Sequence, residues 1–129
     1  MPLPRQDMTG GIGWHELYSA DWQKGFEFYN AMFGWQKGDA MDMGAMGTYQ
    51  IFKSGEVSLG GMMNKPPQMP VSAWQYYLNV GDIDAATARV TQGGGQVMMG
   101  PIQVPGGDWV IHARDPQGAV FALFGKKKG

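Results

Sequence analysis

Residues 14–35 read WHELYSADWQKGFEFYNAMFGW, residues 75–96 read QYYLNVGDIDAATARVTQGGGQ, and the two stretches align at an offset of 61. In each stretch a short strand pattern is followed by an acidic helix start, a helix pattern and a glycine stop. The identical residues are Leu17 and Leu78, Asp21 and Asp82, and Gly34 and Gly95. This repetition predicts an internal duplication, in which two similar modules build one concave site.

Composition indicates a single globular domain. The chain has 129 residues, of which 43% are hydrophobic and 16% are charged, so it can bury a core. A formal net charge of −1 provides no basic field for nucleic acid, and the lack of cysteine excludes disulfides and thiolate metal ligands. No apolar run approaches the roughly 20 residues of a membrane span, and the start MPLPRQDMTGG does not resemble a signal peptide. We therefore expect a cytoplasmic protein that binds neither nucleic acid nor membranes.

The first module begins with a predicted strand over residues 13–19, whose side chains alternate between two faces. One face carries Trp14, Glu16 and Tyr18, and the other carries His15 and Leu17. Asp21 is the predicted N-cap of a helix, and Gly34 is its predicted stop. The predicted apolar stripe of this helix consists of Trp22, Phe26, Tyr29 and Phe33.

The rest of the first half predicts a loop, a hairpin and a linker. The Gly- and Met-rich residues 39–47 are predicted as a loop. Residues 49–53 and 56–63 are predicted as strands that join at Ser54-Gly55. Three prolines within residues 64–70 then predict an extended linker between the two halves.

The second half repeats the same order of elements. Its first predicted strand covers residues 74–80, with Gln75, Tyr77 and Asn79 on one face and Tyr76, Leu78 and Val80 on the other. Asp82 or its neighbour caps a predicted helix that carries Ile83, Ala86 and Val90 and stops at the glycines 93–95. Further strands are predicted over residues 96–99, 108–113 and 119–124. They are separated by a turn-rich connection over residues 101–107 and a proline-containing turn over residues 115–118.

The order and spacing of these motifs resemble the vicinal oxygen chelate (VOC) superfamily, which includes glyoxalase I, bleomycin-resistance proteins and extradiol dioxygenases. The resemblance covers residues 10–125. The two modules begin in a way that is more similar to the bacterial hydroxylase-like or antigen-type branch than to glyoxalase I. Their first strands contain Trp14-x-Glu16-Leu17 and Trp74-x-Tyr76-Tyr77. The matching motifs are Asp21, Phe28-Tyr29, Phe33-Gly34-Trp35, Val80-Gly81-Asp82, Gly94-Gly95 and Asp115-Pro116-Gln117-Gly118.

The resemblance implies an α+β fold made of two βαβββ modules in tandem that form a curved mixed sheet. Residues 1–129 are then a single VOC domain. Its first module covers residues 10–64, its Pro-rich linker residues 65–73, and its second module residues 74–125. In this family each module curls its strands around a cup, and paired modules enclose a ligand, within one chain or across a dimer. A homodimer is therefore a possible assembly.

The resemblance also implies where metal ligands would stand, on the first and last strands of the modules. Those positions fall on Trp14, Gln75, Ala122 and either Leu59 or Gly60. Divalent ions require oxygen or nitrogen donors, usually at least three from the protein, and this set does not supply them. We therefore predict a protein without a metal or another cofactor.

A strand register shifted by one residue would change this prediction. His15 would then replace Trp14, and His112 with Glu56 or Asp108 could complete a ligand set. Such a site would fit a metal-dependent lyase or dioxygenase. The shift would also turn Leu17 into the cup and Trp14 and Tyr18 out of it.

The predicted cup has aromatic walls and a few polar groups, which is the composition of a small-molecule pocket. Trp109 and His112 stand three positions apart on a strand, so only one of them can face the cup. Glu16 is the candidate general base or acid; alternatively, it pairs with a cation or accepts hydrogen bonds as buried charges must. The candidate ligand-binding residues are Trp14, Glu16, Tyr18, Gln75, Tyr77, Asn79, Trp109 and His112.

Three functions follow from this cup. The first is metal-independent binding of a small molecule whose identity the residues do not define. The second is an enzyme, such as a lyase, an isomerase or a glyoxalase-like protein, with Glu16 as the general base. The third is an interaction protein whose cup is vestigial, which the buried polar groups disfavour because they are costly to bury unused. Whether the chain is an enzyme is left open at this point.

Overall fold

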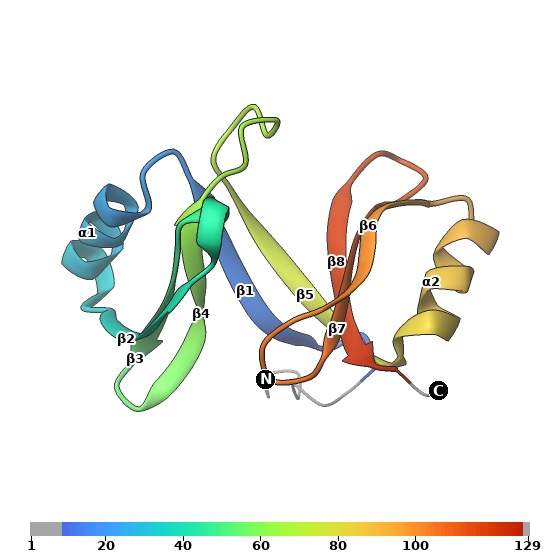
Figure 1. The fold of residues 1–129 in the computed structure, drawn as a ribbon, viewed down its shortest axis with the longest axis horizontal. Coiled ribbons are helices and arrows are strands. Elements are labelled where there is room, and N and C mark those ends of the chain that lie inside the picture. The colour runs from blue at the N-terminus through green and yellow to red at the C-terminus, as the bar shows by residue number, and fades with distance from the viewer. Residues whose placement is uncertain (1–8, 128–129) are drawn as a thin grey trace. The chain divides into compact units, whose positions relative to one another are not determined.

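The computed structural model describes residues 9–127, so the first eight residues of the segment MPLPRQDMTGG lie outside the described residues. The elements follow the predicted order, strand–helix–three strands, twice (Figure 1). This confirms the α+β class and the two βαβββ modules. No helix among residues 9–127 is long and apolar enough to cross a membrane.

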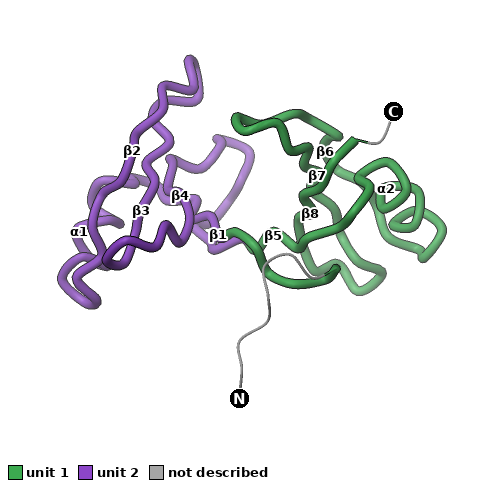
Figure 2. The backbone as a smooth tube through the Cα atoms, turned by 90° about the horizontal axis from the view of Figure 1, so that it is seen from below, with its two compact units in different colours: residues 1–14, 76–129 green, residues 15–75 purple. Residues whose placement is uncertain are grey.

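The bounds of the elements are as follows. The first module contains β1 (Ile12–Ser19), α1 (Trp22–Phe33), β2 (Gln36–Asp42), the short 3₁₀ helix η1 (Gly44–Met46), β3 (Thr48–Ser54) and β4 (Val57–Asn64). The second contains β5 (Ala73–Asp82), α2 (Ile83–Gln92), β6 (Gln96–Gln103), β7 (Trp109–Arg114) and β8 (Val120–Lys126). By contacts, the chain divides into two compact units, residues 15–75 and residues 1–14 with 76–129 (Figure 2).

The first and last strands of each module lie side by side and run parallel. In the first module the strand order is β2-β3-β4-β1, and β1 pairs with β4 so that Glu16 stands opposite Gly61. In the second module the order is β5-β8-β7-β6, and β5 pairs with β8 so that Tyr77 stands opposite Ala122. The remaining neighbours in both modules are antiparallel. Because Glu16 and Tyr77 differ by the repeat offset, as do Gly61 and Ala122, the duplication is maintained in the strand register.

Helix α1 begins and ends where the sequence predicts. The Asp21 carboxylate accepts hydrogen bonds from the backbone N–H groups of Gln23 and Lys24, at 3.1 and 3.4 Å. Gly34 ends the helix with φ of 73°, a left-handed conformation that glycine adopts without steric cost. The buried side of the helix packs a core made of Leu17, Trp22, Phe26, Phe52 and Met62.

The predicted stripe on α1 is wrong for its last member. Phe33 remains 57% exposed. Its ring instead contacts the rings of Tyr29 and Trp35, with centroid distances of 6.3 and 5.2 Å. The helix stops directly after Phe33, so this residue lies beyond the part of α1 that covers the sheet.

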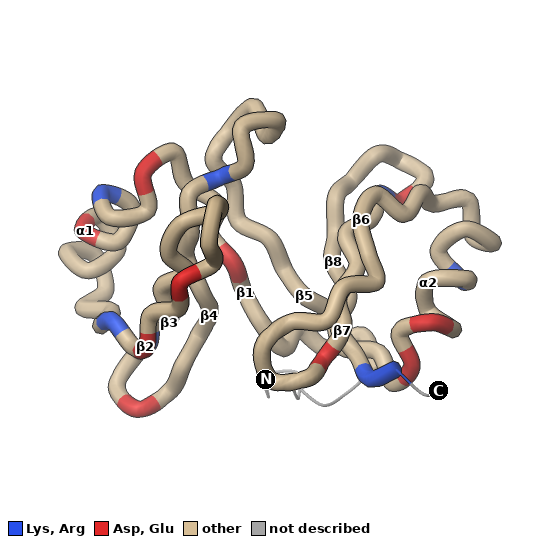
Figure 3. Tube along the Cα trace, in the orientation of Figure 1, with Lys and Arg blue, Asp and Glu red and all other residues tan. Residues whose placement is uncertain are grey.

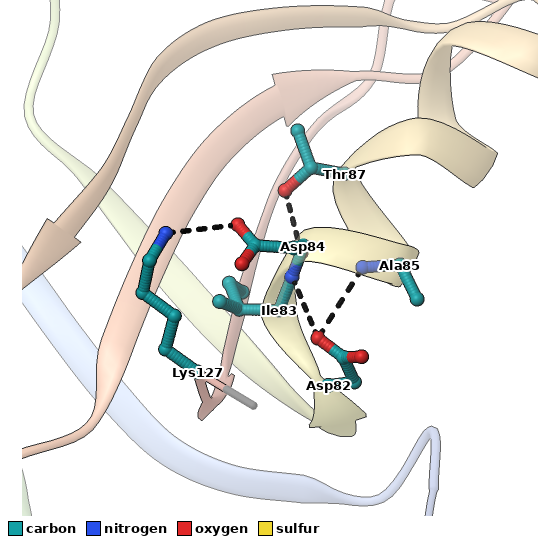
Figure 4. Close-up of polar contacts among 6 residues, drawn as sticks. All are labelled: Asp82, Ile83, Asp84, Ala85, Thr87 and Lys127. Carbon is teal, nitrogen blue, oxygen red and sulfur yellow. Dashed lines mark hydrogen bonds and ion pairs between the residues drawn. The ribbon is translucent and has the colours of Figure 1, made fainter. Parts of the chain in front are cut away.

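Helix α2 is built in the same way. The Asp82 carboxylate accepts hydrogen bonds from the backbone N–H groups of Asp84 and Ala85, at 3.0 and 3.4 Å (Figure 4). Lys127 also reaches the Asp84 carboxylate at 3.1 Å, joining the start of α2 to the end of the described chain (Figure 4). The core beneath α2 consists of Val80, Ile83, Ala86, Ile111, Ala113 and Leu123, with Val90 partly buried beside it.

Two segments differ from the sequence-based prediction. Residues 39–42 are not loop but the end of β2, where Met41 pairs with Tyr49 of β3. Likewise β6 continues to Gln103, so the turn-rich connection is shorter than the predicted 101–107. In both cases pairing with a neighbouring strand overrides the weak strand preference of Gly, Asp and Pro. The linker prediction also ends one residue late, because Ala73 belongs to β5.

We expect Asp82→Ala to destabilise the protein by about 1 kcal/mol, because the substitution removes the side-chain acceptor from two helix N–H groups. Urea-induced unfolding would measure this change. Asp82→Ser should retain most of the stability, since serine also caps helices. Equal losses in the two variants would contradict the capping role.

Candidate functional site

A buried carboxylate lies on the face of the first module opposite α1. Glu16 is the one acidic residue of β1 (Figure 3) and is 9% exposed. The Tyr18 hydroxyl donates to its Oε1 at 2.5 Å, and the Tyr49 hydroxyl donates to its Oε2 at 2.7 Å. Both carboxylate oxygens therefore accept a phenolic hydrogen bond, which is the bonding expected of a buried charged group.

Strand alternation places these groups together. Leu17 turns to the core beneath α1, so its neighbours Glu16 and Tyr18 turn to the other face, as predicted. Tyr49 reaches the carboxylate from β3, two strands away from β1 in the sheet. Glu16 thus accepts hydrogen bonds, with tyrosine hydroxyls as the donors.

Tyr49 was missed by the sequence-based analysis, and a glycine makes its position possible. Gly61 lies opposite Glu16 on β4, and a Cβ added there would overlap the ring and the hydroxyl of Tyr49. The side-chain space of position 61 is therefore filled by Tyr49. The pair Gly60-Gly61 inside a predicted strand was the available signal, because glycine in a strand often marks the close approach of another group.

The two tyrosines that bind the carboxylate pack against sulfur-containing and aliphatic side chains. Tyr18, Tyr49 and Met63 form a buried cluster, and Met41, Ile51 and Met69 pack against it while remaining partly exposed. Methionine is flexible and polarizable, so such a surface can adapt to ligands of different shapes. The arrangement is an apolar face with one charged hydrogen-bonding group at its base, which we name the Glu16 face.

The second module carries a different polar pair at the equivalent place. The Tyr77 hydroxyl lies 2.8 Å from Nε2 of His112, and the two rings meet edge to face with a centroid distance of 5.5 Å. Tyr77 packs with Val110 and Ala122, and Trp14 lies partly buried against this group.

Of the two alternatives on β7, His112 lies on the Tyr77 face. Trp109 packs instead against the core beneath α2, with the Lys127 ammonium 4.9 Å from its ring centroid. Residues an odd number of positions apart point to opposite faces of a strand, so Trp109 leaves the candidate site.

The remaining predicted residues are placed as follows. Gln75 is buried. Asn79 forms backbone hydrogen bonds with Gly10 and Gly11, both at 2.8 Å. It also lines an open pocket of about 370 Å³. Asp108 and Lys126, which form an ion pair at 2.7 Å, line the same pocket.

The residues at the expected metal positions do not fit a metal ion. The register corrects one of these positions, since Gly61, and not Leu59 or Gly60, is the counterpart of Ala122. Neither glycine nor alanine supplies a donor atom. Within residues 9–127, no three His, Asp or Glu side chains are grouped so that they could hold a metal.

The alternative ligand set is also dispersed. Nδ1 of His15 lies 3.0 Å from the Leu59 carbonyl oxygen. Glu56 is exposed in the turn between β3 and β4, and Asp108 pairs with Lys126. His112 bonds to Tyr77. The strands keep the predicted alternation, so the one-residue shift that would bring His15 onto the Glu16 face does not occur.

We expect Gly61→Ala to destabilise the protein by about 1–3 kcal/mol, because the new methyl group overlaps the Tyr49 ring. Gly81→Ala is the matched control, since a Cβ at Gly81 meets no atom within 4 Å. Denaturant unfolding of both variants, and of Gly61→Ala combined with Tyr49→Ala, would measure the coupling. If the cost of Gly61→Ala is the same with and without Tyr49, the two positions do not share this space.

Comparisons with known proteins agree with this architecture. Residues 11–123 match the family model described as Glyoxalase/Bleomycin resistance protein/Dioxygenase superfamily. "Putative glyoxylase CFP32" of Mycobacterium bovis is 32% identical over 115 residues, which are 89% of this chain and 44% of that protein. "Anthracycline biosynthesis protein DnrV" of Streptomyces peucetius is 31% identical over an alignment of 131 positions, gaps included, which covers 91% of this chain and 47% of that protein. The chain therefore spans about half the length of the curated relatives it matches.

A solved structure shows the same fold at low sequence identity. Methylmalonyl-CoA epimerase from Mycobacterium tuberculosis aligns with a TM-score of 0.67 and 13% identity, over 94% of this chain and 93% of the epimerase. Identity this low supports the fold alone. With a family model that covers both modules, the chain belongs to the Glyoxalase/Bleomycin resistance protein/Dioxygenase superfamily, the VOC superfamily.

Proposed function

We propose that this protein binds a small, mainly apolar molecule on the Glu16 face and that it does so without a metal ion. The Glu16 carboxylate is the polar anchor of the ligand, and the methionine and tyrosine side chains around it supply the apolar contacts. The observation that carries the proposal is the burial of Glu16 between two tyrosine hydroxyls, at 2.5 and 2.7 Å, on the face of the sheet opposite α1.

The internal repeat supports a functional reason for this carboxylate. Burying a charge is costly even when it is paired, and a fold keeps such a group only where something compensates the cost. The second module forms the same parallel strand pair with Tyr77 at the equivalent position, opposite Ala122. The fold therefore does not need an acid here, which favours a role for Glu16 in binding.

The apolar surroundings support a ligand with a ring or alkyl surface. Three methionines and two tyrosines contribute to the Glu16 face, and aromatic and thioether groups make favourable contacts with rings. One relative at 31% identity is named for anthracycline biosynthesis and another at 32% is named a putative glyoxylase. Each is about twice as long as this chain, and these names suggest the ligand classes to test first: anthracyclines and small carbonyl compounds.

We expect a thermal-shift screen of these two ligand classes to find compounds that raise the melting temperature. A bound compound increases the free energy of unfolding by RT ln(1 + [L]/Kd). For such a compound, Glu16→Gln should weaken binding about tenfold or more, measured by calorimetry, because a charge-assisted contact is lost. The matched control is Glu56→Gln, which changes an exposed glutamate in the β3–β4 turn.

Metal independence has its own test. Treatment with a chelator should leave ligand affinity unchanged. Elemental analysis verifies that the treated protein contains no metal. A stoichiometric transition metal whose removal abolishes binding would contradict the proposal. Equal affinities in Glu16→Gln and Glu56→Gln would contradict the assignment of the anchor.

A second candidate is a lyase, isomerase or glyoxalase-like enzyme with Glu16 as its general base. The carboxylate favours this candidate because hydrogen bonds from the two tyrosines restrain its orientation. A bound carbonyl compound would then exchange a carbon-bound hydrogen in D₂O, which proton NMR detects. Loss of this exchange by about 100-fold in Glu16→Gln is the expected result, whereas exchange that survives the substitution would exclude Glu16 as the base.

A further inference from the structure

The turn between β2 and β3 carries three methionines in the pattern Met41-x-Met43-x-x-Met46. Met43 and Met46 are 36% and 51% exposed, and neither belongs to a buried core cluster of residues 9–127. Methionine is usually found inside proteins, where it fills gaps in the core. Core filling therefore does not explain why two of these three side chains stand at the surface.

The backbone of this turn is closed by hydrogen bonds of its own (Figure 1). The Met43 N–H donates to the Gly47 carbonyl oxygen at 2.8 Å, and the Met46 N–H donates to the Met43 carbonyl oxygen at 3.3 Å. The Asp42 carboxylate accepts from the Gly44 N–H at 2.9 Å. These bonds surround η1 and define where each methionine leaves the backbone.

The spacing of the three methionines brings their side chains to one side of the turn. Met41 and Met43 stand two positions apart, and residues at that spacing share one face of a strand. Met43 and Met46 stand three positions apart across η1, and side chains at that spacing eclipse each other in a 3₁₀ helix. Methionine has three rotatable bonds beyond the backbone, so the three thioether sulfurs can reach a common point.

The charges and the ligand atoms of the turn favour a soft cation. Residues 39–48 contain two acids, Asp39 and Asp42, and no Lys, Arg or His, so the local field attracts positive charge. Thioether sulfur is a soft ligand, and soft sulfur ligands select Cu(I). Zn²⁺ prefers thiolate, imidazole and carboxylate ligands, and Mg²⁺ prefers oxygen, so a thioether set discriminates against both.

We infer that the β2–β3 turn is a binding site for Cu(I), with the thioether sulfurs of Met41, Met43 and Met46 as the ligands. The site is distinct from the ligand binding proposed for the Glu16 face, because Met43 and Met46 lie outside the cluster that forms that face. A thioether has no proton to lose, so the ion binds without proton release.

Silver provides a direct probe of the site. Ag(I) is a soft cation with the same charge as Cu(I), and it needs no reductant. Titration of the full chain with silver nitrate in a chloride-free buffer should shift the methyl NMR signals of Met41, Met43 and Met46 in labelled protein. Because thioethers do not titrate, the Kd should change by less than about twofold between about pH 6 and 8, the range in which histidine ligands lose their proton.

Two double variants test the ligand set. Met43→Leu combined with Met46→Leu removes two sulfurs and keeps apolar side chains of similar volume, so the Ag(I) affinity should fall at least about tenfold. Met98→Leu combined with Met99→Leu is the matched control and should leave the affinity unchanged. It also removes two exposed sulfurs, from β6, where no third methionine is near in the sequence.

Three results would overturn the inference. The first is equal Ag(I) affinity in the two double variants, or Ag(I)-induced shifts that are confined to other methionines. The second is a Kd for Ag(I) weaker than about 10 μM in the unchanged protein. The third is binding of Zn²⁺ or Mg²⁺ as tight as that of Ag(I), which would indicate a carboxylate site. The proposed binding on the Glu16 face survives all three, because the small-molecule affinity of the Met43→Leu, Met46→Leu protein is expected to be unchanged.

Discussion

The parallel pairing of the first and last strands within each module is the constraint on which the other features depend. Parallel neighbours cannot be joined by a tight turn, so the chain crosses over between them through a helix and two further strands. In the first module this places α1 on one side of the sheet, where Leu17, Trp22 and Phe26 form the core. The other side is left to Glu16, Tyr18 and Tyr49. The strand register, with Glu16 opposite Gly61, then determines which side chains can meet.

The sequence predicts those parts of the fold that local chemistry controls. Asp21 caps α1 and Gly34 ends it because a side-chain acceptor and a left-handed residue are needed at those points. The alternation around Leu17 correctly separates the two faces of β1. These features depend on neighbours in the chain, which the sequence displays directly.

The parts that could not be predicted depend on partners far away in the sequence. Residues 39–42 become strand only because β3 lies beside them. Tyr49 belongs to the candidate site only because position 61, on another strand, has no side chain. The choice between Trp109 and His112 likewise needed the positions of Tyr77 and of the core beneath α2. Strand periodicity shows that Trp109 and His112 point to opposite faces of β7, but it does not identify which of the two faces carries the candidate site.

The duplicated framework and its divergent side chains have separate roles. The register of the parallel strands and the aspartate N-caps of the helices are the same in both modules. The residues opposite each other on the parallel strands differ: Glu16 with Gly61 in one module and Tyr77 with Ala122 in the other. Because the Tyr49 ring fills the side-chain space of position 61, substitutions at these two positions depend on each other. A lineage that acquires a larger residue at position 61 must first, or at the same time, give up the aromatic ring at position 49. The two codons are expected to change together among descendants of this chain, although they stand 12 positions apart in the sequence.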